Sequence, residues 1–555
     1  MSKYLPLLFL VLLVTTSSVL SAQTSLDVYQ IFKTKCAACH SNNDPQNGLD
    51  LQGAGNSDAE KMASVRNNIV NVTPNNSFAA AQGQRYIYPG RVDKSMIFRK
   101  INQGLDSQIT LHSDEGDPMP NSPFPSLSDP EKELIRQWIL YGAPATGDLK
   151  VNNVLVTDMI EEYYDGNGAA SFPDGPPPAP APGEGFQIKM GPFFLPPNGE
   201  VEYLQKYALD LPAKIEVNRL DFKIASYSHH FILYKFKDAA TNTSAGLRTN
   251  SNHFNIDIVG AVQQAEDIKL PEGTSFFWND DQVLDLNSHY INYSNTMIYQ
   301  AEAYLNVYTQ PSGTAAQEMI TELLPNISIP IPNNGNLIGH NKLNLNLNHS
   351  TDSEVFIWAL SGHTHKYGKD YTAKLYTNNT ASDLIYDAKC PEGVPGCPSP
   401  FFDYQHIPIR YFDPLFPANF NGSSAGVQHQ AKWVNSGPSP VGFGFTSDDE
   451  MMILIIMYTN DTTGIAPTSL NEKNPLDAAT ISPNPMINYS VIEVPENLGP
   501  IQLQLFDILG NAIRPPEQHF ETRIRLERRD LVSGVYLYRL ADQQGRFHTG
   551  KIVVQ

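Results

Sequence analysis

The sequence predicts a multidomain, mainly β protein, in which an α-helical N-terminal domain is followed by three β units. Three observations support this fold class. The chain has 555 residues, enough for about three to five domains of ordinary size. Its 42 prolines and 37 glycines suit a loop-rich β chain better than a helical one. Runs rich in β-branched and aromatic residues recur from about residue 186 onward, separated by turns rich in Asn, Gly and Pro.

Composition narrows the function classes. The chain carries 38 Lys and Arg against 58 Asp and Glu, which gives a net charge of −20 and a pI of about 5.1. This acidity argues against a general nucleic-acid binder, which needs a basic surface. Only 4 cysteines are present, too few for a disulfide-dense scaffold.

Residues 1–22 have the pattern of a secretory signal peptide. Lys3 supplies a positive start, an apolar run extends from Leu5 to Val14, and small residues lead up to Ala22. A membrane anchor is the alternative, but the apolar run is too short to span a bilayer comfortably. We therefore expect a cleaved signal that directs export across the inner membrane.

Residues 23–145 are predicted to form a compact, partly helical domain. Its clearest helix is Asp129–Ile139, which Ser128 can cap and which has a proline in its first turn. Residues 146–185 are predicted as a linker, because the stretch FPDGPPPAPAPGEG at 172–185 has no periodic apolar pattern.

Two β-sandwiches are expected after the linker, at 186–325 and 326–465, divided near the segment PNISIPIPNNGNL. The strand candidates are KIEVNRLDFKIA, HHFILYKF, IYQAEAYLNVYT and MMILIIMYT. Residues 470–555 form a further β unit, with strands such as IQLQLFDI and VYLYRL.

Residues 36–40 read CAACH, the pattern that attaches c-type haem. Cys36 and Cys39 would bond the vinyl groups, and His40 would ligate the iron. A redox pair or half of a zinc site is the alternative. However, no second C-x-x-C pair follows, and neither alternative explains the histidine directly after the second cysteine. We therefore expect one covalently bound haem c.

The second axial ligand of the iron is expected downstream. Met119, in the Pro-rich loop DPMPN, is the first choice, and Met96 and His112 are competitors. With CAACH, PGRVDKSMIFRKI, the MP loop and a closing LIRQWILYGA, the segment resembles small class I-type cytochrome c domains over about 120 residues. The resemblance implies His40 and Met119 as the axial ligands, although the usual MPP reads MPN here.

Three groups of histidines stand out in the middle β region. His229 and His230 are adjacent, His289 is single, and His363 and His365 form an HTH motif. On a strand, residues i and i+2 share a face, so the HTH pair can hold one metal. Adjacent histidines point apart, so the HH pair could share a metal only at a bend or bulge, with a third ligand such as His289. The alternative is that all are buried histidines with structural partners.

The same region resembles the copper type II monooxygenases, the group of peptidylglycine α-hydroxylating monooxygenase and dopamine β-monooxygenase. Those enzymes carry an HH pair and a distant His for one copper, and HTH with a Met for the other. The Met lies in a TSxDEM-type strand, which here reads TSDDEMMILIIMYT. The resemblance covers about 280 residues and implies two linked jelly-roll-like sandwiches, each holding one copper. The implied ligands are His229, His230 and His289 at the first site, and His363, His365 and Met451 at the second, with Met452 as the alternative.

The resemblance implies an enzyme that uses O2 to hydroxylate a C–H bond of a small-molecule substrate. Its catalytic residues would be His363, His365 and Met451, because a thioether helps to hold the reduced copper that binds O2. The all-histidine site would supply the second electron. Electrons would come from a donor protein or an ascorbate-like reductant, which the fused haem would replace or relay. A non-catalytic electron-transfer or copper-binding surface protein, or an adhesion module, is the alternative.

The sequence departs from the resembling family in two respects. Peptide-amidating members bind the substrate carboxylate with an Arg and a Tyr. The corresponding positions here are Ser361 and Ile455, so a peptide C-terminus is not the expected substrate. The animal enzymes are rich in disulfides, whereas only Cys390 and Cys397 remain here. These two could close a small disulfide loop, or they could be unpaired buried thiols.

The C-terminal tail resembles the type IX secretion sorting domain. The matching features are ISPNP at 481–485, LQLFDILGNAI at 503–513, LVSGVYLYRL at 531–540 and the final GKIVVQ. The resemblance implies export across the outer membrane to the cell surface, with the type IX machinery as a partner. An ordinary terminal β-sandwich, such as a sugar-binding module, is the alternative.

Overall fold

The computed structural model describes most of the chain from Thr24 onward. The predicted signal peptide and both Cys390 and Cys397 lie outside the described residues. No helix within the described part is long and apolar enough to cross a membrane. The described residues are 24–225, 227–249, 255–344, 347–350, 354–378, 380–389, 402–404, 407–420, 424–444, 448–465, 476, 479–495, 500–507, 512–529, 531–542 and 547–555.

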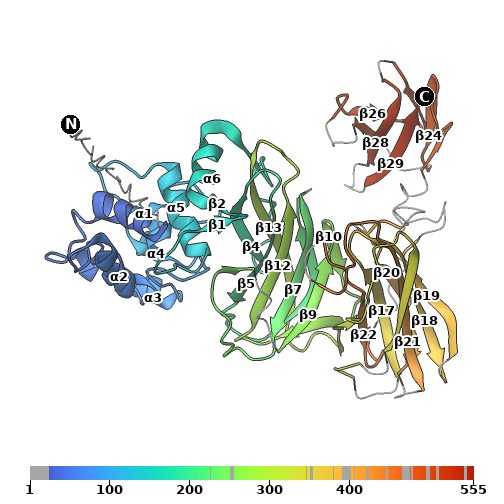
Figure 1. Cartoon of the computed structure of the whole chain (residues 1–555), viewed down its shortest axis with the longest axis horizontal. Helices are drawn as coiled ribbons and strands as arrows, with labels where there is room; N and C mark the ends of the chain where they lie inside the picture. The colour runs from blue at the N-terminus through green and yellow to red at the C-terminus, as the bar shows by residue number, and fades with distance from the viewer. Residues whose placement is uncertain are drawn as a thin grey trace, which may run out of the picture. The chain divides into compact units, whose positions relative to one another are not determined.

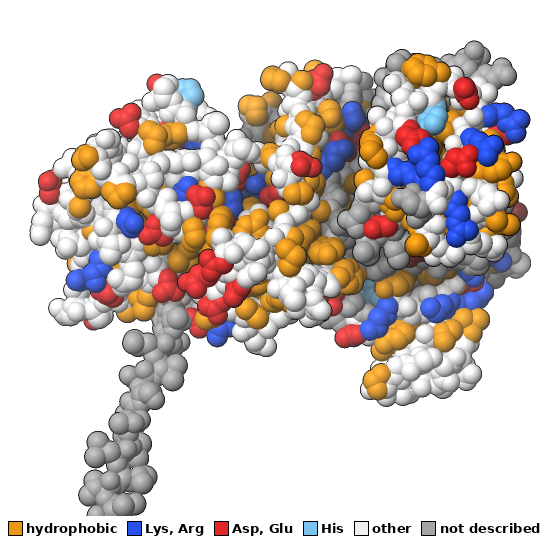
Figure 2. All heavy atoms as spheres, turned by 90° about the horizontal axis from the view of Figure 1, so that it is seen from above, with side chains coloured by type: hydrophobic (Ala, Val, Ile, Leu, Met, Phe, Trp, Pro, Cys, Tyr) orange, Lys and Arg blue, Asp and Glu red, His pale blue; other side chains and the backbone are white. Residues whose placement is uncertain are grey.

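The chain divides into two compact units. The first comprises the residues up to Lys214 together with Leu220–Asp267 and Asn279–Val307, and the remainder forms the second. Most elements are strands of sandwich-type sheets, as the composition predicts, and helices are few (Figure 1). On the face drawn in Figure 2, basic side chains lie among acidic ones.

The N-terminal region of the first unit is built from short helices and loops (Figure 1). Its last long helix, α5, spans Asp129–Leu140 and confirms the prediction for this segment. The Ser128 side chain accepts a hydrogen bond from the Glu131 amide, and the Glu131 carboxylate accepts one from the Ser128 amide. The helix therefore begins with a capping box. The preceding helices are α1 (Thr24–Ile31), a π-helical turn η1 (Phe32–Cys36), α2 (Asp58–Ile69), α3 (Ser77–Ala81) and α4 (Met96–Ile101).

The predicted linker at 146–185 is partly structured. It contains β1 (Lys150–Val151), β2 (Val154–Leu155), α6 (Val156–Glu162), a π-helical turn η4 (Tyr163–Asn167) and β3 (Gly168–Ala170). β3 pairs in parallel with β13 and so belongs to a sheet. The Pro-rich composition therefore describes only 171–184, the part without helix or strand; apolar residues such as Met159 and Ile160 are buried before it.

The first sandwich has a seven-stranded and a five-stranded sheet. The larger runs β14-β11-β6-β13-β3, with β10 on β6 and β4 on β13, and the smaller runs β8-β5-β12-β7-β9. Phe193 of β4 packs edge-on against Tyr203 of β5 and Tyr290 of β12, so aromatic rings fill the space between the sheets. The strands are β4 (Gly185–Leu195), β5 (Glu200–Ala208), β6 (Ile215–Lys223), β7 (Ser228–Phe236), β8 (Leu247–Arg248), β9 (Ile256–Val262), β10 (Glu266–Lys269), β11 (Thr274–Trp278), β12 (Val283–Ile291), β13 (Ile298–Pro311) and β14 (Gln317–Glu318).

The second sandwich, within the second unit, has two four-stranded sheets of order β15-β22-β17-β20 and β16-β21-β18-β19. A continuous apolar core lies between them, in which Trp433 and Tyr371 are among the largest buried side chains. The strands are β15 (Ile320–Pro325), β16 (Leu337–Asn344), β17 (Glu354–His363), β18 (Gly368–Thr377), β19 (Thr380–Asp387), β20 (Arg410–Asn419), β21 (Ala425–Val434) and β22 (Ile453–Thr459).

The C-terminal sandwich has its own core, which includes Leu476, Ile492 and Tyr538. Its sheets run β23-β24-β27 and β26-β25-β28-β29. The strands are β23 (Thr480–Ser482), β24 (Tyr489–Glu493), β25 (Ile501–Phe506), β26 (Glu517–His519), β27 (Arg523–Glu527), β28 (Gly534–Ala541) and β29 (Phe547–Val554).

Candidate metal and haem sites

A β-bulge positions the adjacent histidines of β7. His230 lies opposite His289 of β12, but the next pair along is Ser228 with Tyr290, so β7 has one more residue than β12 at this point. The additional residue is His229. A bulge of this kind bends the strand and re-aims a side chain. The irregularity that the HH pair requires is therefore present.

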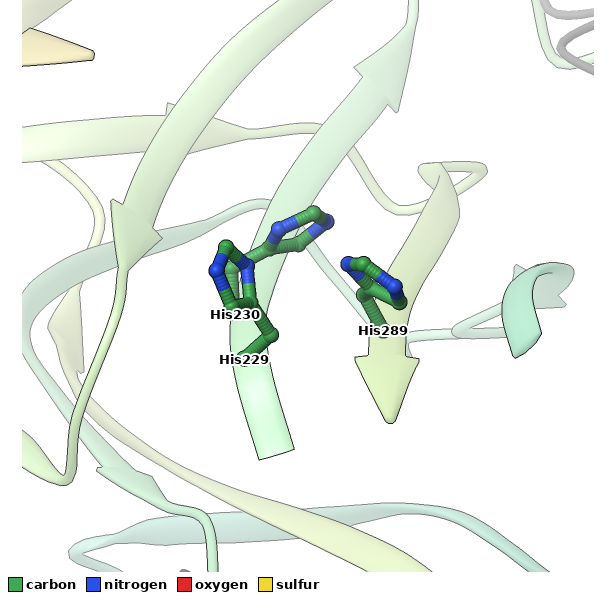
Figure 3. A group of neighbouring side chains, drawn as sticks. All are labelled: His229, His230 and His289. Carbon is green, nitrogen blue, oxygen red and sulfur yellow. The ribbon is translucent and has the colours of Figure 1, made fainter. Parts of the chain in front are cut away.

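The three imidazoles of this region are neighbours. Figure 3 shows His229 and His230 on one strand and His289 on the next, with their rings turned toward a common space. The ring centroid of His289 is 5.0 Å from that of His229 and 5.2 Å from that of His230. All three side chains are buried, and one ligand nitrogen from each lies within 4.8 Å of the others. A small approach of the rings would give each a metal–nitrogen distance of about 2 Å.

Carboxylates on β5 hold two of these rings by their Nε2 atoms. His289 Nε2 donates to Glu200 Oε1 at 2.8 Å, and His230 Nε2 donates to Glu202 Oε1 at 3.2 Å. Asn287 is a second acceptor for His230, at 3.2 Å, and itself donates to Glu202. Burial raises the pKa of Glu202, but the hydrogen bond from His230 and the nearby imidazoles more than offset this and lower it to about 2. Glu202 is therefore ionised at neutral pH.

The HTH histidines lie at the end of β17, beside the start of β22. His363 is paired with Ile453, and the same antiparallel register, if extended by two residues beyond the strand ends, would bring His365 opposite Met451. In such a continued register His363, His365 and Met451 would share a face, although β17 ends at His363 and β22 begins at Ile453. The two imidazole centroids are 5.2 Å apart, with the rings nearly perpendicular at 87°.

The two methionines of the EMM segment have different surroundings. Met452 is fully buried in the core of the second sandwich together with Leu454 and Ile456, and its sulfur accepts from Asn326 at 3.5 Å. Met451 has the opposite strand parity and is 9% exposed. The strand geometry therefore favours Met451 over Met452 as the neighbour of the HTH pair.

Glu450 fixes the backbone around the second histidine group. Its carboxylate accepts from the amides of His365 at 2.8 Å and Tyr367 at 2.7 Å, and from Trp433 Nε1 at 2.8 Å. Burial raises its pKa to about 7 in spite of these bonds. His365 Nδ1 donates to the Asp449 carbonyl at 3.1 Å.

The CAACH segment borders a large cavity. The cavity has a volume of about 970 Å³, and its lining includes Cys36, Cys39, His40, Met96 and Met119. Burial lowers the pKa of His40, so its ring is neutral at pH 7, the form that can ligate iron. Burial raises the pKa of the Cys36 thiol to about 12.

The structure separates the three candidates for the second axial ligand. Met119 lines the cavity; its amide donates a hydrogen bond to the Lys100 carbonyl, and its carbonyl accepts one from the Gln103 side chain. Met96 also lines the cavity, at the start of α4. His112 is not among the lining residues and stacks on Phe78, with ring centroids 4.4 Å apart. Met119 and Met96 therefore remain as sources of a sulfur ligand.

Sequence reasoning missed the carboxylates and the amide around the histidines, namely Glu200, Glu202, Asn287 and Glu450. Glu450 directly precedes Met451, so the DDEM motif gave a signal for it. Glu200 and Glu202 are far from any histidine in sequence and become neighbours only through the pairing of β5 with β12.

Comparisons with known proteins identify the C-terminal domain. Residues 480–555 match the family described as the secretion system C-terminal sorting domain. The predicted type IX sorting domain is therefore confirmed, with the match beginning ten residues later than predicted. The protein is directed to the cell surface or beyond, and the secretion machinery is its partner in export.

Elsewhere the comparisons carry no functional argument. No curated protein matches the sequence. The solved major capsid protein P2 of bacteriophage PM2 is 8% identical, with a TM-score of 0.21, over 49% of this chain and 97% of its own. The BSP domain of a biofilm-associated protein is 9% identical, with a TM-score of 0.13, over 64% of this chain and 81% of its own. Similarities this weak do not define a shared fold.

Proposed function

We propose that this protein is a secreted copper-dependent monooxygenase that hydroxylates a C–H bond of a small substrate with O2, using electrons relayed by a fused c-type haem. The observation that carries the proposal is the cluster of His229, His230 and His289, which a bulge gathers in a buried position. A bulge that brings adjacent histidines toward a third one has no evident role in packing, but it suits a three-nitrogen metal site.

The donor sets fit copper at both sites. Three imidazoles at the first site suit Cu(II), and the carboxylates at Nε2 of His230 and His289 would fix these two rings so that Nδ1 faces the metal. At the second site, His363, His365 and Met451 would offer two nitrogens and a thioether, a set that favours Cu(I). When bound there, copper would supply the one-electron chemistry needed to reduce O2. The chain's part is to hold the ligands, as Glu450 does for the backbone of His365.

The surroundings of the second site limit the substrate. Ser361 and Ile455, the positions at which peptide-amidating relatives carry Arg and Tyr, are directly opposite each other in the pairing of β17 with β22. Neither can bind a carboxylate by charge. We therefore propose a substrate without a carboxylate at this position.

The N-terminal region suits a covalently bound haem. Two thiols and a neutral imidazole line one cavity, and Met119 or Met96 can supply a sulfur ligand from the same lining. We assign Met119 as that ligand, because its backbone is fixed by two hydrogen bonds. Such a haem would be suited to electron transfer.

Metal content and O2 uptake test the proposal together. Purified full-length protein should contain one iron and two coppers per chain, measured by elemental analysis. The reduced protein is then mixed with each compound of a panel of small, uncharged molecules that carry C–H bonds. It should consume O2 with at least one of them. His363→Ala should abolish this uptake and leave the haem spectrum unchanged. Protein that binds no copper at the histidine cluster would refute the assignment.

A second candidate is a non-catalytic surface protein for electron transfer or copper binding. The uncharged pair Ser361 and Ile455 favours it, because the family's substrate-reading groups are missing. Full copper loading without substrate-dependent O2 uptake across the panel would select this candidate.

A further inference from the structure

The N-terminal region packs directly on the first sandwich within the first unit. Gln137 of α5 donates to the Pro192 carbonyl of β4 at 2.7 Å, and Gln205 of β5 donates to the Gly90 carbonyl at 2.7 Å. Both bonds are buried. They tie a helix and a loop of the N-terminal region to neighbouring elements of the sandwich.

Buried charges and close backbone contacts reinforce this packing. Asp106 accepts from Lys189 of β4 at 2.9 Å and lies 3.7 Å from the buried Arg136 of α5. A Cβ on Gly246 would come within 2.5 Å of the Gly142 amide nitrogen, so the two backbones approach as closely as glycine allows. The N-terminal region is therefore docked on the sandwich, with defined contacts.

A pair of tyrosines crosses the same interface. The hydroxyl groups of Tyr141, at the C-terminal end of α5, and Tyr203 of β5 are 2.7 Å apart, and the rings meet edge to face with centroids 5.7 Å apart. Burial raises the pKa of both phenols, so both keep their protons at neutral pH and one donates to the other.

The contact continues from Tyr203 to the histidine cluster. The Tyr203 carbonyl accepts from Asn287 Nδ2 at 3.2 Å, and Asn287 Oδ1 accepts from His230 Nε2 at 3.2 Å. On the other side, Tyr141 follows Trp138 by one turn of α5. Trp138 packs edge-on against Phe32, 6.5 Å between centroids, and Phe32 opens the turn that ends at Cys36.

We propose that Tyr141, Tyr203 and Asn287 form the electron-transfer route from the haem domain to the histidine cluster. This inference rests on the proposed function and specifies the path of its electrons. The route would carry one electron at a time, with a haem held by Cys36, Cys39 and His40 as the reductant and a copper held by His229, His230 and His289 as the oxidant. No covalent bond forms or breaks, and no proton is transferred.

The physical reason is the continuity of the contacts. Electronic coupling is stronger through covalent and hydrogen bonds than across gaps between side chains, and every link from Tyr141 to His230 is a covalent or hydrogen bond. The docking contacts keep the donor domain in a fixed position, so transfer does not depend on diffusion of a tethered domain. Removal of one phenol hydroxyl breaks the route and leaves the ligands of both cofactors in place.

The test measures haem absorbance over time, starting from protein whose haem has been reduced by one electron. Full-length protein with ferrous haem and Cu(II) is prepared without O2 or substrate, and haem reoxidation is recorded by rapid mixing. Tyr141→Phe and Tyr203→Phe should each slow this reoxidation several-fold while metal content and haem midpoint potential stay at wild-type values. The matched control is Tyr163→Phe, which removes a hydroxyl bonded to Gln300 of β13, a strand of the sheet that does not carry the histidine cluster.

Reoxidation at the wild-type rate in both tyrosine variants would overturn the route, as would an equal slowing in Tyr163→Phe. Copper-depleted wild-type protein should show no reoxidation; if it does, the electron goes elsewhere and the inference fails. These outcomes differ from failure of the proposed function, in which no copper binds at the cluster at all.

Discussion

Glu202 and Glu200 are bonded to Nε2 of His230 and His289, at 3.2 and 2.8 Å. A carboxylate in this position selects the tautomer with a proton on Nε2, so that Nδ1 has the lone pair that a metal needs. The carboxylate also makes the imidazole more basic, and so a stronger ligand for a metal. The first site is therefore defined by the carboxylates of β5 as well as by its three histidines.

Glu202→Gln should weaken copper binding at the first site by about 10–100-fold, because an amide holds the imidazole less firmly and without charge. Competitive copper titration of the full-length protein measures the change. Glu184→Gln, at an exposed position of the same unit, is the control and should bind as the wild type does. Equal affinity in the two variants would contradict the supporting role of Glu202.

Met451 and Met452 offer a matched pair of substitutions. Leucine has a similar volume, so Met451→Leu and Met452→Leu should each change the free energy of unfolding by less than about 1.5 kcal/mol. Only Met451→Leu should lower copper occupancy at the second site and abolish O2 uptake, because the Met452 sulfur lies in the apolar core. Elemental analysis of each variant distinguishes them, and loss of copper from Met452→Leu alone would reverse the assignment.

Glu115 makes the N-terminal region sensitive to acid. Burial raises its pKa, but bonds from Arg99, the His112 amide and Gln84 outweigh burial and lower the pKa from 4.5 to about 2. A depressed folded-state pKa stabilises the fold above the unfolded value and ceases to do so as pH falls through the folded value. The stabilisation should therefore be present above about pH 4.5 and disappear toward pH 2.

Glu115→Gln should lower the free energy of unfolding at pH 7 by about 2 kcal/mol, since it removes hydrogen bonds to a charged group. It should also flatten the loss of stability between pH 4.5 and 2. Denaturant unfolding followed by haem absorbance at several pH values tests both effects. Glu161→Gln, at an exposed position of α6, should follow the wild-type curve.

At the scale of elements, short sequence patterns predicted the elements whose formation depends on neighbouring residues. The helix predicted at 129–139 is α5, because capping and periodicity are properties of neighbouring residues. The bulge on β7 could be inferred, because two adjacent histidines can turn toward one point only at such an irregularity. Strand alternation also predicted that the HTH histidines would be neighbours, and their ring centroids are 5.2 Å apart, although β17 ends at His363.

Elements that depend on distant partners could not be predicted. β3 forms because β13 offers it an edge, and its sequence, GAA, carries no strand signal. The contact between Tyr141 and Tyr203 joins residues 62 apart, and nothing near either tyrosine indicates the other. Composition misassigned 146–170 as linker for the same reason, since short elements there are stabilised by packing and not by their own periodicity.

α5 is the element through which the N-terminal region meets the sandwich, so its stability should be measurable. Ser128→Ala removes the side-chain acceptor of the capping box and should cost about 1 kcal/mol of unfolding free energy. Urea unfolding followed by haem absorbance gives the value. Ser107→Ala, at an exposed position, should have no effect, and an equal loss there would show that the cap is not the cause.

At the scale of the whole molecule, the parts differ in how closely they depend on one another. The N-terminal region shares buried hydrogen bonds and an ion pair with β4 and β5 of the first sandwich, and these strands belong to the same compact unit as that region. The C-terminal domain has a separate apolar core that begins at Leu476. An export signal with its own core can be removed after use without opening the cores that hold the candidate sites.

Truncation after Ile465 should therefore separate export from metal chemistry. The shortened protein lacks residues 480–555, which match the sorting-domain family. It should therefore accumulate between the inner and outer membranes of its host instead of reaching the surface. Its haem spectrum, copper content and O2 uptake should equal those of the full chain, because the C-terminal domain has an apolar core separate from that of the second sandwich. Cell fractionation and elemental analysis measure the two properties. Surface display of the truncated protein would show that export uses another signal, and loss of copper would show that the C-terminal domain supports the sites.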